Sequence, residues 1–371
     1  MVQPKTNSCL QMKIAIIGTR GIPNNYGGFE QLAEYLSVIL SNDGYDITVY
    51  NSSLHPYQET KFHNVKIVHC TDPENKLGTA GQFIYDLNCI LHCRKQQYDI
   101  ILQLGYTSSS VWSFLFPKKS KIVTNMDGLE WKRSKYGRFT KLFLKQAEKW
   151  AAKYSDILVA DSKGIQNYLK KEYKKESTYI PYGANVFNVP GKSILTKFNL
   201  EPFSYYLVIA RMEPENNIET VINGYLESKS NNSLVIIGST KTSFGQYLKK
   251  TYTNSSILFL ESIYDLDILN QLRFYSNIYF HGHSVGGTNP SLLEAMASGA
   301  YICAHRNEFN EYILENDASY FNTPKEVQEV IQQFIPTEKR GIALKNNETK
   351  IIDLYSWKNI SSAYVKVFEK T

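Results

Sequence analysis

The strongest candidate for chemistry is a glycine-containing turn between an apolar run and a proline-initiated helical stretch. It reads His281-Gly-His283-Ser-Val-Gly286-Gly287-Thr288-Asn289-Pro290. Because proline favours the first position of a helix, we expect a helix to begin at Pro290. The N-terminus of a helix presents free amides that attract anions. We therefore predict that the backbone amides of residues 287–289 hold a diphosphate.

Polar side chains flank this turn on both sides. Glu294 falls one turn into the predicted helix, where a carboxylate can accept a hydrogen bond from a ribose hydroxyl. The alternative is a carboxylate on the solvent-exposed side of the helix that binds no ligand. His283 follows the apolar run 278–280, and its residue type alone is consistent with a histidine packed at the end of a strand. The pair His281 and His283 also suggests zinc, but a third ligand is not apparent, so we expect no metal.

A second glycine-rich loop follows the apolar run 13–17. It contains Gly18, Gly21, Gly27 and Gly28 before entering an amphipathic stretch. The adjacent pair Gly27-Gly28 at a helix start favours a phosphate or sugar site, and a plain strand-to-helix connection is the alternative. The spacing does not fit the dinucleotide-binding fingerprint.

Apolar runs of about four to six residues alternate with helical-period stretches along almost the whole chain. The first series predicts strands at 13–17, 47–50, 66–69, 99–104, 121–126 and 157–159, and helices at 29–40, 82–93 and 140–153. The second predicts strands at 205–209, 234–237, 257–260, 278–280 and 300–304, and helices at 217–227 and 290–298. Buried strands joined by helices indicate parallel sheets covered on both faces.

These two series predict an α/β fold of two doubly wound Rossmann-like domains whose ligand sites face each other across a cleft. The turn-rich stretch 181–191 separates them, so the predicted domains are 1–185 and 186–355, with a C-terminal helix at 356–371 packing back on the first. The length of 371 residues fits two domains better than one. A composition with 43% hydrophobic and 20% charged residues excludes a disordered or fibrous chain.

The formal net charge of +6 is unevenly distributed. Residues 1–185 carry 24 Lys/Arg against 16 Asp/Glu, and the remaining residues carry 17 against 19. This asymmetry indicates an anionic partner for the first half. The segment 118–153 concentrates the excess, with 11 basic and 3 acidic residues. Nucleic acid is not expected, because no recognition motif accompanies the charge.

Within this basic segment, Phe139, Leu142, Phe143, Gln146 and Trp150 recur at helical spacing. The basic side chains predicted to form a membrane or acceptor-side patch are Lys132, Arg133, Lys135, Arg138, Lys141 and Lys145. Such a helix could rest on anionic lipid. The alternative is a helix whose apolar stripe packs on its own sheet while its lysines are solvated.

The five cysteines show no zinc-ligand spacing and suit a reducing compartment. The N-terminus lacks a secretory signal, and no run of about 18 apolar residues occurs. We expect a cytoplasmic protein, peripheral on the inner face of the cell membrane if the basic helix binds lipid.

The sequence resembles the retaining glycosyltransferases of family 4, whose two-domain architecture is called GT-B. The motifs that carry the resemblance are Gly27-Gly28-Phe-Glu30, Ile180-Pro-Tyr-Gly183, Ala210-Arg211-Met-Glu-Pro214, Glu294-Ala-Met-Ala-Ser-Gly299 and Ser356-Trp357. More narrowly, 17–23, 125–131 and 281–290 resemble a bacterial subgroup that includes rhamnosyltransferases of capsule and exopolysaccharide synthesis.

The resemblance implies transfer of a sugar with retention, with L-rhamnose from dTDP-rhamnose as the best guess. The acceptor would be a lipid-linked saccharide in cell-surface polysaccharide synthesis, bound by residues 1–185, while 186–355 would bind the nucleotide-sugar donor. The motifs require no cofactor and no metal. The alternatives are a non-catalytic nucleotide-sugar-binding or scaffold protein, and a nucleotide-sugar epimerase or phosphorylase on the same architecture.

The resemblance also assigns roles to residues. Arg211 and the amides of 287–289 would stabilise charge on the leaving diphosphate, and Gly27, Gly28, Asn216 and Glu294 would complete the donor site. Asp127, Glu130 and His283 are the candidate catalytic residues, which would orient the donor sugar or the acceptor hydroxyl.

The chain departs from the family pattern at three of these positions. Gly286 stands where the family has the first of two glutamates, Asn216 where it has a lysine, and Asp127 where it has a histidine. Since the subgroup shares these changes, we expect a different donor sugar and not an inactive enzyme.

Overall fold

The computed structural model describes residues 12–126, 128–133, 136–188 and 190–370, and it divides into two compact units. The first contains the described residues of Met1–Asp127, Arg138–Ile180 and Ile360–Thr371. The second contains those of Gly128–Gly137 and Pro181–Asn359. The short segment Gly128–Gly137 thus belongs to the second unit, although the chain on either side of it belongs to the first.

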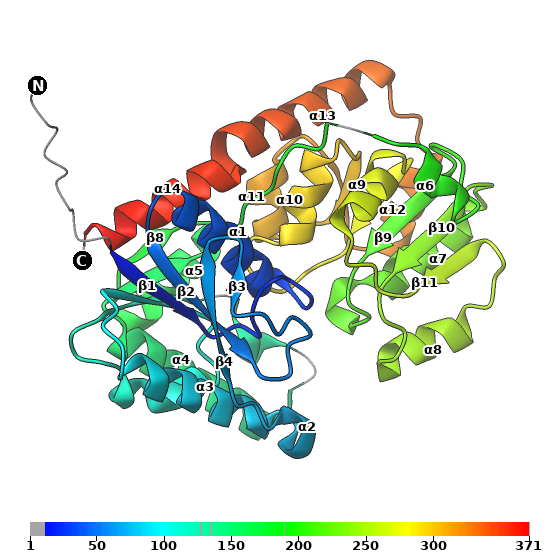
Figure 1. The fold of residues 1–371 in the computed structure, drawn as a ribbon. Helices are drawn as coiled ribbons and strands as arrows, with labels where there is room; N and C mark the ends of the chain where they lie inside the picture. Colours follow the sequence, from blue (N-terminus) through cyan, green and yellow to red (C-terminus); the bar gives the residue numbers. More distant parts are fainter. Residues whose placement is uncertain (1–11, 127, 134–135, 189, 371) are drawn as a thin grey trace, which may run out of the picture. The chain divides into compact units, whose positions relative to one another are not determined.

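The first unit is built on an eight-stranded sheet with the order β3-β4-β2-β1-β5-β6-β7-β8 (Figure 1). Its strands are β1 (Lys13–Ile17), β2 (Asp46–Ser52), β3 (Lys61–Phe62), β4 (Val65–Cys70), β5 (Ile100–Leu104), β6 (Lys121–Asn125), β7 (Ile157–Ala160) and β8 (Ser177–Tyr179). All pairings are parallel except β3 with β4. Only two residues join β3 to β4, and so short a connection can join only antiparallel strands. The predicted parallel sheet is therefore confirmed, apart from this edge.

Helices cover both faces of the first sheet. In Figure 1, α1 (Gly28–Asn42) lies on one face, while α3 (Ala80–Cys93) and α4 (Arg138–Tyr154) lie on the other. Residues of α5 (Lys163–Tyr173) join α4 and β7 in one apolar cluster. Shorter helical elements are α2 (Glu74–Leu77), η1 (Ser109–Leu115) and η2 (Glu130–Lys132). The last helix, α14 (Trp357–Phe368), contacts this unit through Tyr364, whose hydroxyl accepts a hydrogen bond from Asn125 at 3.1 Å.

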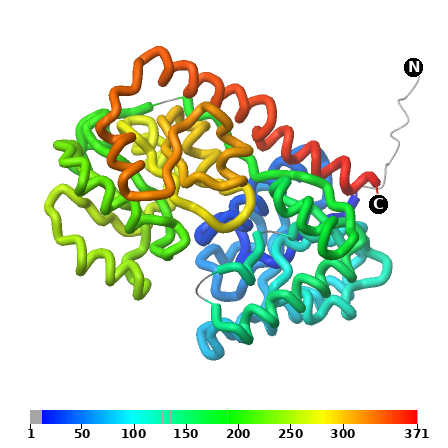
Figure 2. Tube along the Cα trace, turned by 180° about the vertical axis from the view of Figure 1, so that it is seen from behind, coloured from blue at the N-terminus to red at the C-terminus, as the bar shows by residue number. Residues whose placement is uncertain are grey.

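The second unit contains a six-stranded sheet that is parallel throughout its described pairings, with the order β11-β10-β9-β12-β13-β14. Figure 2 traces the backbone of this unit from behind, mostly in green, yellow and orange. Its strands are β9 (Tyr205–Ile209), β10 (Ser233–Ile237), β11 (Ile257–Leu260), β12 (Ile278–His281), β13 (Ile302–His305) and β14 (Ser319–Phe321). Its helices are α6 (Ser193–Thr196), α7 (Ile218–Ser228), α8 (Ser243–Thr251), α9 (Leu266–Phe274), α10 (Pro290–Ala297), α11 (Glu308–Leu314), α12 (Pro324–Gln332) and α13 (Thr337–Lys350), with η3 (Pro214–Asn216) and η4 (Ile351–Tyr355). The predicted α/β class with two Rossmann-like sheets is confirmed.

Helix α4 buries a different stripe from the predicted one. Its buried residues are Leu144, Ala147, Glu148, Ala151 and Ala152. Phe139 and Leu142, which the predicted stripe contained, are 88% and 64% exposed. None of the helices in the described ranges has both the length and the apolar character needed to cross a lipid bilayer.

A buried carboxylate explains the rotation of α4. Glu148 is 1% exposed and accepts hydrogen bonds from the hydroxyls of Tyr168, at 2.6 Å, and Tyr173. Lys145 pairs with the same carboxylate at 3.2 Å. Because a buried charge is tolerated only when it is paired and hydrogen-bonded, Glu148 must face these partners. Phe139 and Leu142 are then turned toward solvent.

Replacing this carboxylate tests the explanation. Glu148→Ala removes the acceptor of three tyrosine hydroxyls, those of Tyr106, Tyr168 and Tyr173, and we expect the free energy of unfolding to fall by about 2–4 kcal/mol in urea denaturation. Glu172→Ala is the matched control, because Glu172 is 46% exposed and lies 3.3 Å from the same Lys145. It should cost less than about 1 kcal/mol. Equal losses for the two variants would contradict the account.

Candidate functional site

The predicted turn and helix N-terminus are present in the second unit. Asn289 caps α10, its Oδ1 accepting a hydrogen bond from the Ser291 amide at 2.9 Å, and Pro290 is the first helical residue. Among the described residues, no hydrogen bond uses the backbone amide of Gly287 or Asn289. These amides therefore remain available to an anion at the positive end of the helix.

Gly286 has a backbone conformation that explains why glycine stands there. Its φ is +123°, a region that residues with a side chain rarely adopt. Among the described residues, its chain neighbours aside, no atom lies within 4 Å of the position that a Cβ would take. A side chain would therefore have space at this position, but the backbone conformation disfavours every residue except glycine. A glutamate here would strain the turn.

The loop after β9 carries Arg211 and packs against the turn. Arg211 is exposed, whereas Asn216 is buried and its Nδ2 donates to the Arg211 carbonyl at 2.8 Å. Asn217 donates to the Gly282 carbonyl, also at 2.8 Å. Asn216 thus stabilises the conformation of the loop. The contacts with a donor that were predicted for Asn216 and Arg211 stay predictions.

His281 and His283 stack on each other, with ring centroids 4.5 Å apart. Neither ring nitrogen of the buried His281 has a hydrogen-bond partner within the described residues, nor does Nδ1 of His283. Burial, together with the positive charges of Arg211 and Arg133, lowers the pKa of His283 to about 3. His283 is therefore neutral at physiological pH, when one ring nitrogen donates and the other accepts. The described residues contain no group of three or more His, Cys, Asp or Glu side chains arranged to hold a metal.

Glu294 is not a solvated helix carboxylate. It pairs with Arg273 of α9 at 2.5 Å, and Arg273 is 1% exposed. The guanidinium also donates to Asn270 at 3.0 Å and to Ser291 at 3.1 Å. The sequence interpretation missed Arg273. The available signal was its place beside Leu272, on the apolar side of an amphipathic helix.

The segment at 128–133 reaches the same turn. A Cβ on Gly128 would lie 2.9 Å from the Cα of Gly286, so the two backbones approach closely. Glu130, a candidate catalytic residue, accepts a hydrogen bond from Nε of Arg133 at 2.7 Å. Asp127, the other candidate in this segment, lies outside the described residues.

The basic residues predicted as one patch have different surroundings. Lys132 is exposed and lies over the Trp131 ring, whereas Arg133 is ion-paired in the second unit. On α4, Arg138 is exposed, Lys141 is half-buried and Lys145 pairs with Glu148 and Glu172. Lys135 lies outside the described residues.

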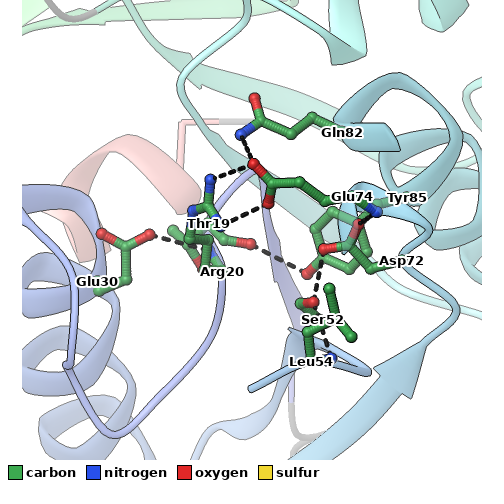
Figure 3. A network of polar contacts seen from close by, with 9 residues as sticks. All are labelled: Thr19, Arg20, Glu30, Ser52, Leu54, Asp72, Glu74, Gln82 and Tyr85. Carbon is green, nitrogen blue, oxygen red and sulfur yellow. Dashed lines mark hydrogen bonds and ion pairs between the residues drawn. The ribbon is translucent and has the colours of Figure 1, made fainter. Parts of the chain in front are cut away.

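A polar network joins the carboxyl ends of three strands in the first unit (Figure 3). Arg20, after β1, forms a two-pronged ion pair with Glu74 at 2.5 and 2.8 Å. The Glu74 amide donates to Asp72 at 2.9 Å, and the Ser52 hydroxyl donates to the same carboxylate at 2.6 Å. The charge of Arg20 is thus matched by a carboxylate. Sequence reasoning missed this network, whose members are far apart along the chain.

The glycine-rich loop of the first unit is held by Glu30, which accepts a hydrogen bond from the Arg20 amide at 2.9 Å. Burial raises the pKa of Glu30, and hydrogen bonds from backbone amides oppose this shift. Gly27 is the N-cap of α1, and the nearest atom to a Cβ there would be Glu30 Oε2 at 3.4 Å. Gly27 and Gly28 are both half-buried, and their predicted role in donor binding stays a prediction.

A second buried carboxylate of the first unit was also missed. Asp86 on α3 is buried and accepts a hydrogen bond from the Ser108 hydroxyl at 2.5 Å. Burial raises the pKa of Asp86 to about 7, while the Ser108 hydrogen bond acts in the opposite direction. Asp86 thus binds a proton in the folded protein at a pH where the unfolded chain has lost it.

This pKa predicts a pH dependence of stability. Because the folded pKa lies above the unfolded one, the contribution of protonated Asp86 is full below about pH 4 and is lost as pH rises through about 7. Wild type should lose up to about 4 kcal/mol of unfolding free energy relative to Asp86→Asn between pH 4 and pH 8. Urea titrations at several pH values measure this difference, and parallel curves for the two proteins would refute it.

Comparison with protein families gives one match, which covers the first half of the chain. Residues 11–185 match the model described as "Domain of unknown function (DUF1972)". No curated protein matches the sequence.

Solved structures resemble the chain over nearly its whole length. Sucrose-phosphate synthase from Thermosynechococcus elongatus is 16% identical with a TM-score of 0.78, covering 97% of this chain and 99% of that one. HepE from Anabaena in complex with UDP-glucose is 14% identical with a TM-score of 0.75, covering 97% and 100%. WaaG, a glycosyltransferase involved in lipopolysaccharide biosynthesis, is 12% identical with a TM-score of 0.70, again covering 97% and 100%. These similarities establish that the chain has the GT-B fold.

Proposed function

We propose that the protein is a glycosyltransferase whose second unit binds a nucleotide-sugar donor. The observation that carries the proposal is the pair of unused amides, Gly287 and Asn289, at the N-terminus of α10. Arg211 on the neighbouring loop supplies a positive charge, and Glu294 supplies a fixed carboxylate for a ribose hydroxyl. Binding a nucleoside diphosphate calls for all three kinds of group: amide donors and a positive charge for the phosphates, and a carboxylate for the ribose. HepE, which shares the fold, is described in complex with UDP-glucose.

The proposed reaction proceeds with retention. The anomeric bond to the diphosphate breaks, the acceptor hydroxyl forms the new bond on the same face, and the departing phosphate takes the proton. Arg211, the amides and the dipole of α10 stabilise the charge that develops on the diphosphate. Neutral His283 would hydrogen-bond the donor sugar. In this scheme the chain needs no cofactor, no metal and no protein base.

The donor sugar is proposed to be L-rhamnose carried on dTDP. This choice follows the resemblance of 17–23, 125–131 and 281–290 to the rhamnosyltransferase-containing subgroup of family 4. The positive φ of Gly286 supports a sugar pocket without the usual first glutamate. A donor that needs that carboxylate would be bound less well than one that does not.

The acceptor is proposed to be a lipid-linked saccharide in cell-surface polysaccharide synthesis, reached with the protein peripheral on the inner face of the cell membrane. The exposed Phe139 and Leu142 of α4, beside exposed Arg138 and Lys149, support a surface that rests on anionic lipid. WaaG, which shares the fold, acts in lipopolysaccharide biosynthesis.

Two observations favour a second candidate, a non-catalytic nucleotide-sugar-binding protein. Asn216 uses its amide to hold a turn, and Gly286 cannot easily be exchanged for a glutamate. Such a protein would bind a nucleoside diphosphate without turnover, whereas an epimerase on the same architecture would convert the donor in the absence of an acceptor.

A donor screen tests the activity. Purified protein is mixed with a panel of nucleotide sugars, with and without lipid-linked saccharide, and nucleoside diphosphate release is followed. We expect acceptor-dependent release, a fall of about 100-fold or more in kcat/KM for Arg211→Ala, and a raised KM for Glu294→Gln. Arg306→Ala, at an exposed ion pair with Glu311, is the control and should behave as wild type. Absence of release with every donor would reject the glycosyltransferase.

A flotation assay tests the membrane surface separately. Liposomes with and without anionic phospholipid are mixed with wild type, with Phe139→Ser/Leu142→Ser and with Arg138→Glu/Lys149→Glu. Each basic residue near an anionic surface contributes roughly 1 kcal/mol, so the charge reversal should lower bound protein by more than about tenfold. Lys325→Glu, at an exposed lysine of the second unit, is the control. Unchanged flotation of both double variants would refute lipid binding by α4.

A further inference from the structure

The segment Gly128–Gly137 brings a second arginine to the turn before α10. The segment belongs to the second unit. A Cβ on Gly128 would lie 2.9 Å from Gly286 Cα and 3.6 Å from the amide nitrogen of Gly287. The segment therefore runs against the backbone that presents the unused amide of Gly287, and Arg133 follows five residues later.

Two carboxylates define where the Arg133 guanidinium lies. Its Nε and one terminal nitrogen contact Oε1 of Glu130, at 2.7 and 2.6 Å. Its other terminal nitrogen lies 3.9 Å from Oε1 of Glu215, a charge contact longer than a hydrogen bond. The Arg133 side chain is 16% exposed, so it is held in place but still reachable from solvent.

The contact with Glu215 places Arg133 beside the turn. The Glu215 carbonyl accepts hydrogen bonds from the amide and hydroxyl of Ser284, at 3.1 and 2.7 Å. Ser284 follows His283, and the charge of Arg133 acts on His283 together with that of Arg211. Both arginines therefore lie within electrostatic range of the same point on the turn.

A diphosphate at this point carries more than one negative charge, whereas Arg211 supplies a single positive charge. Asn216 adds none, because its amide group is neutral and hydrogen-bonded to the Arg211 carbonyl. A guanidinium is suited to phosphate because its planar fork of donors matches two oxygens at once. The electrostatics of the site thus favour a second cation, and Arg133 is the one that the described residues place there.

We propose that Arg133 is a donor-binding residue whose guanidinium contacts the diphosphate alongside Arg211, with Glu130 setting its orientation. The inference rests on the proposed function for the identity of the ligand, and it reassigns Arg133 from the predicted membrane patch to the donor site. Glu130, predicted as catalytic, acts in this scheme through Arg133 as a positioning residue.

Calorimetric titration with inorganic pyrophosphate and with dTDP tests this role in the full chain. Arg133→Gln should weaken both affinities by about tenfold and should reduce their salt dependence. Lys132→Gln removes the same charge from the neighbouring exposed residue and should change either affinity less than about twofold. Thermal melts of each variant establish that the chain is folded. Equal affinities of wild type and Arg133→Gln would overturn the proposal.

A variant at Glu130 shows whether Arg133 binds the ligand directly or only stabilises the loop through its ion pair with Glu130. Glu130→Gln keeps a side chain that can hydrogen-bond Arg133 and removes a negative charge near the site, so pyrophosphate should bind as in wild type or more tightly. If Glu130→Gln lost as much affinity as Arg133→Gln, the arginine would act only through the ion pair, and the proposal would be wrong.

The same titrations distinguish an error in the proposed role of Arg133 from an error in the proposed glycosyltransferase activity. Pyrophosphate binding that depends on Arg133, combined with no release from any nucleotide sugar, would support the anion site and reject the glycosyltransferase. Wild type that binds neither pyrophosphate nor dTDP would overturn both.

Discussion

The buried ion pair between Arg273 and Glu294 is the interaction on which the proposed donor site depends. Arg273 is inaccessible to solvent, and an uncompensated guanidinium there would be strongly destabilising. Its partners Glu294 and Ser291 both lie on α10, so the pair fixes that helix against α9. The position of the unused amides at the start of α10 follows from the same contact. Glu294 is held in place before any ligand arrives, which lowers the cost of ordering the site.

Ion pairs also decide which basic residues of the first half remain available to a partner. Arg20 is matched by Glu74 and Lys145 by Glu148, whereas Arg133 is held by Glu130 at the proposed donor site of the second unit. The positive charge that the sequence concentrates in 118–153 is therefore divided between the second unit and the exposed face of α4. Basic residues form a positively charged surface only where no nearby carboxylate pairs with them; within the described ranges, Arg138 and Lys149 have no ion pair.

The strands were predictable because each is a short apolar run, and β1, β9 and β11 have the predicted bounds. The turn and start of α10 were predictable from Pro290 and the glycines. The buried stripe of α4 was not, since Glu148 looks like a surface residue until its partners on α5 are known. Arg273, Asp86 and the Arg20 network were missed for the same reason: a buried polar residue is recognisable only with its partner, and those partners lie from 21 to 54 residues away. The membership of Gly128–Gly137 in the second unit likewise has no local signal.

A crystal structure of the protein with a nucleoside diphosphate bound would test donor binding at α10 most directly. We expect phosphate oxygens within hydrogen-bond distance of the amides of Gly287 and Asn289, the guanidinium of Arg211 beside them, and the ribose hydroxyls on Glu294. A nucleotide bound elsewhere, with the N-terminus of α10 occupied only by water, would contradict it.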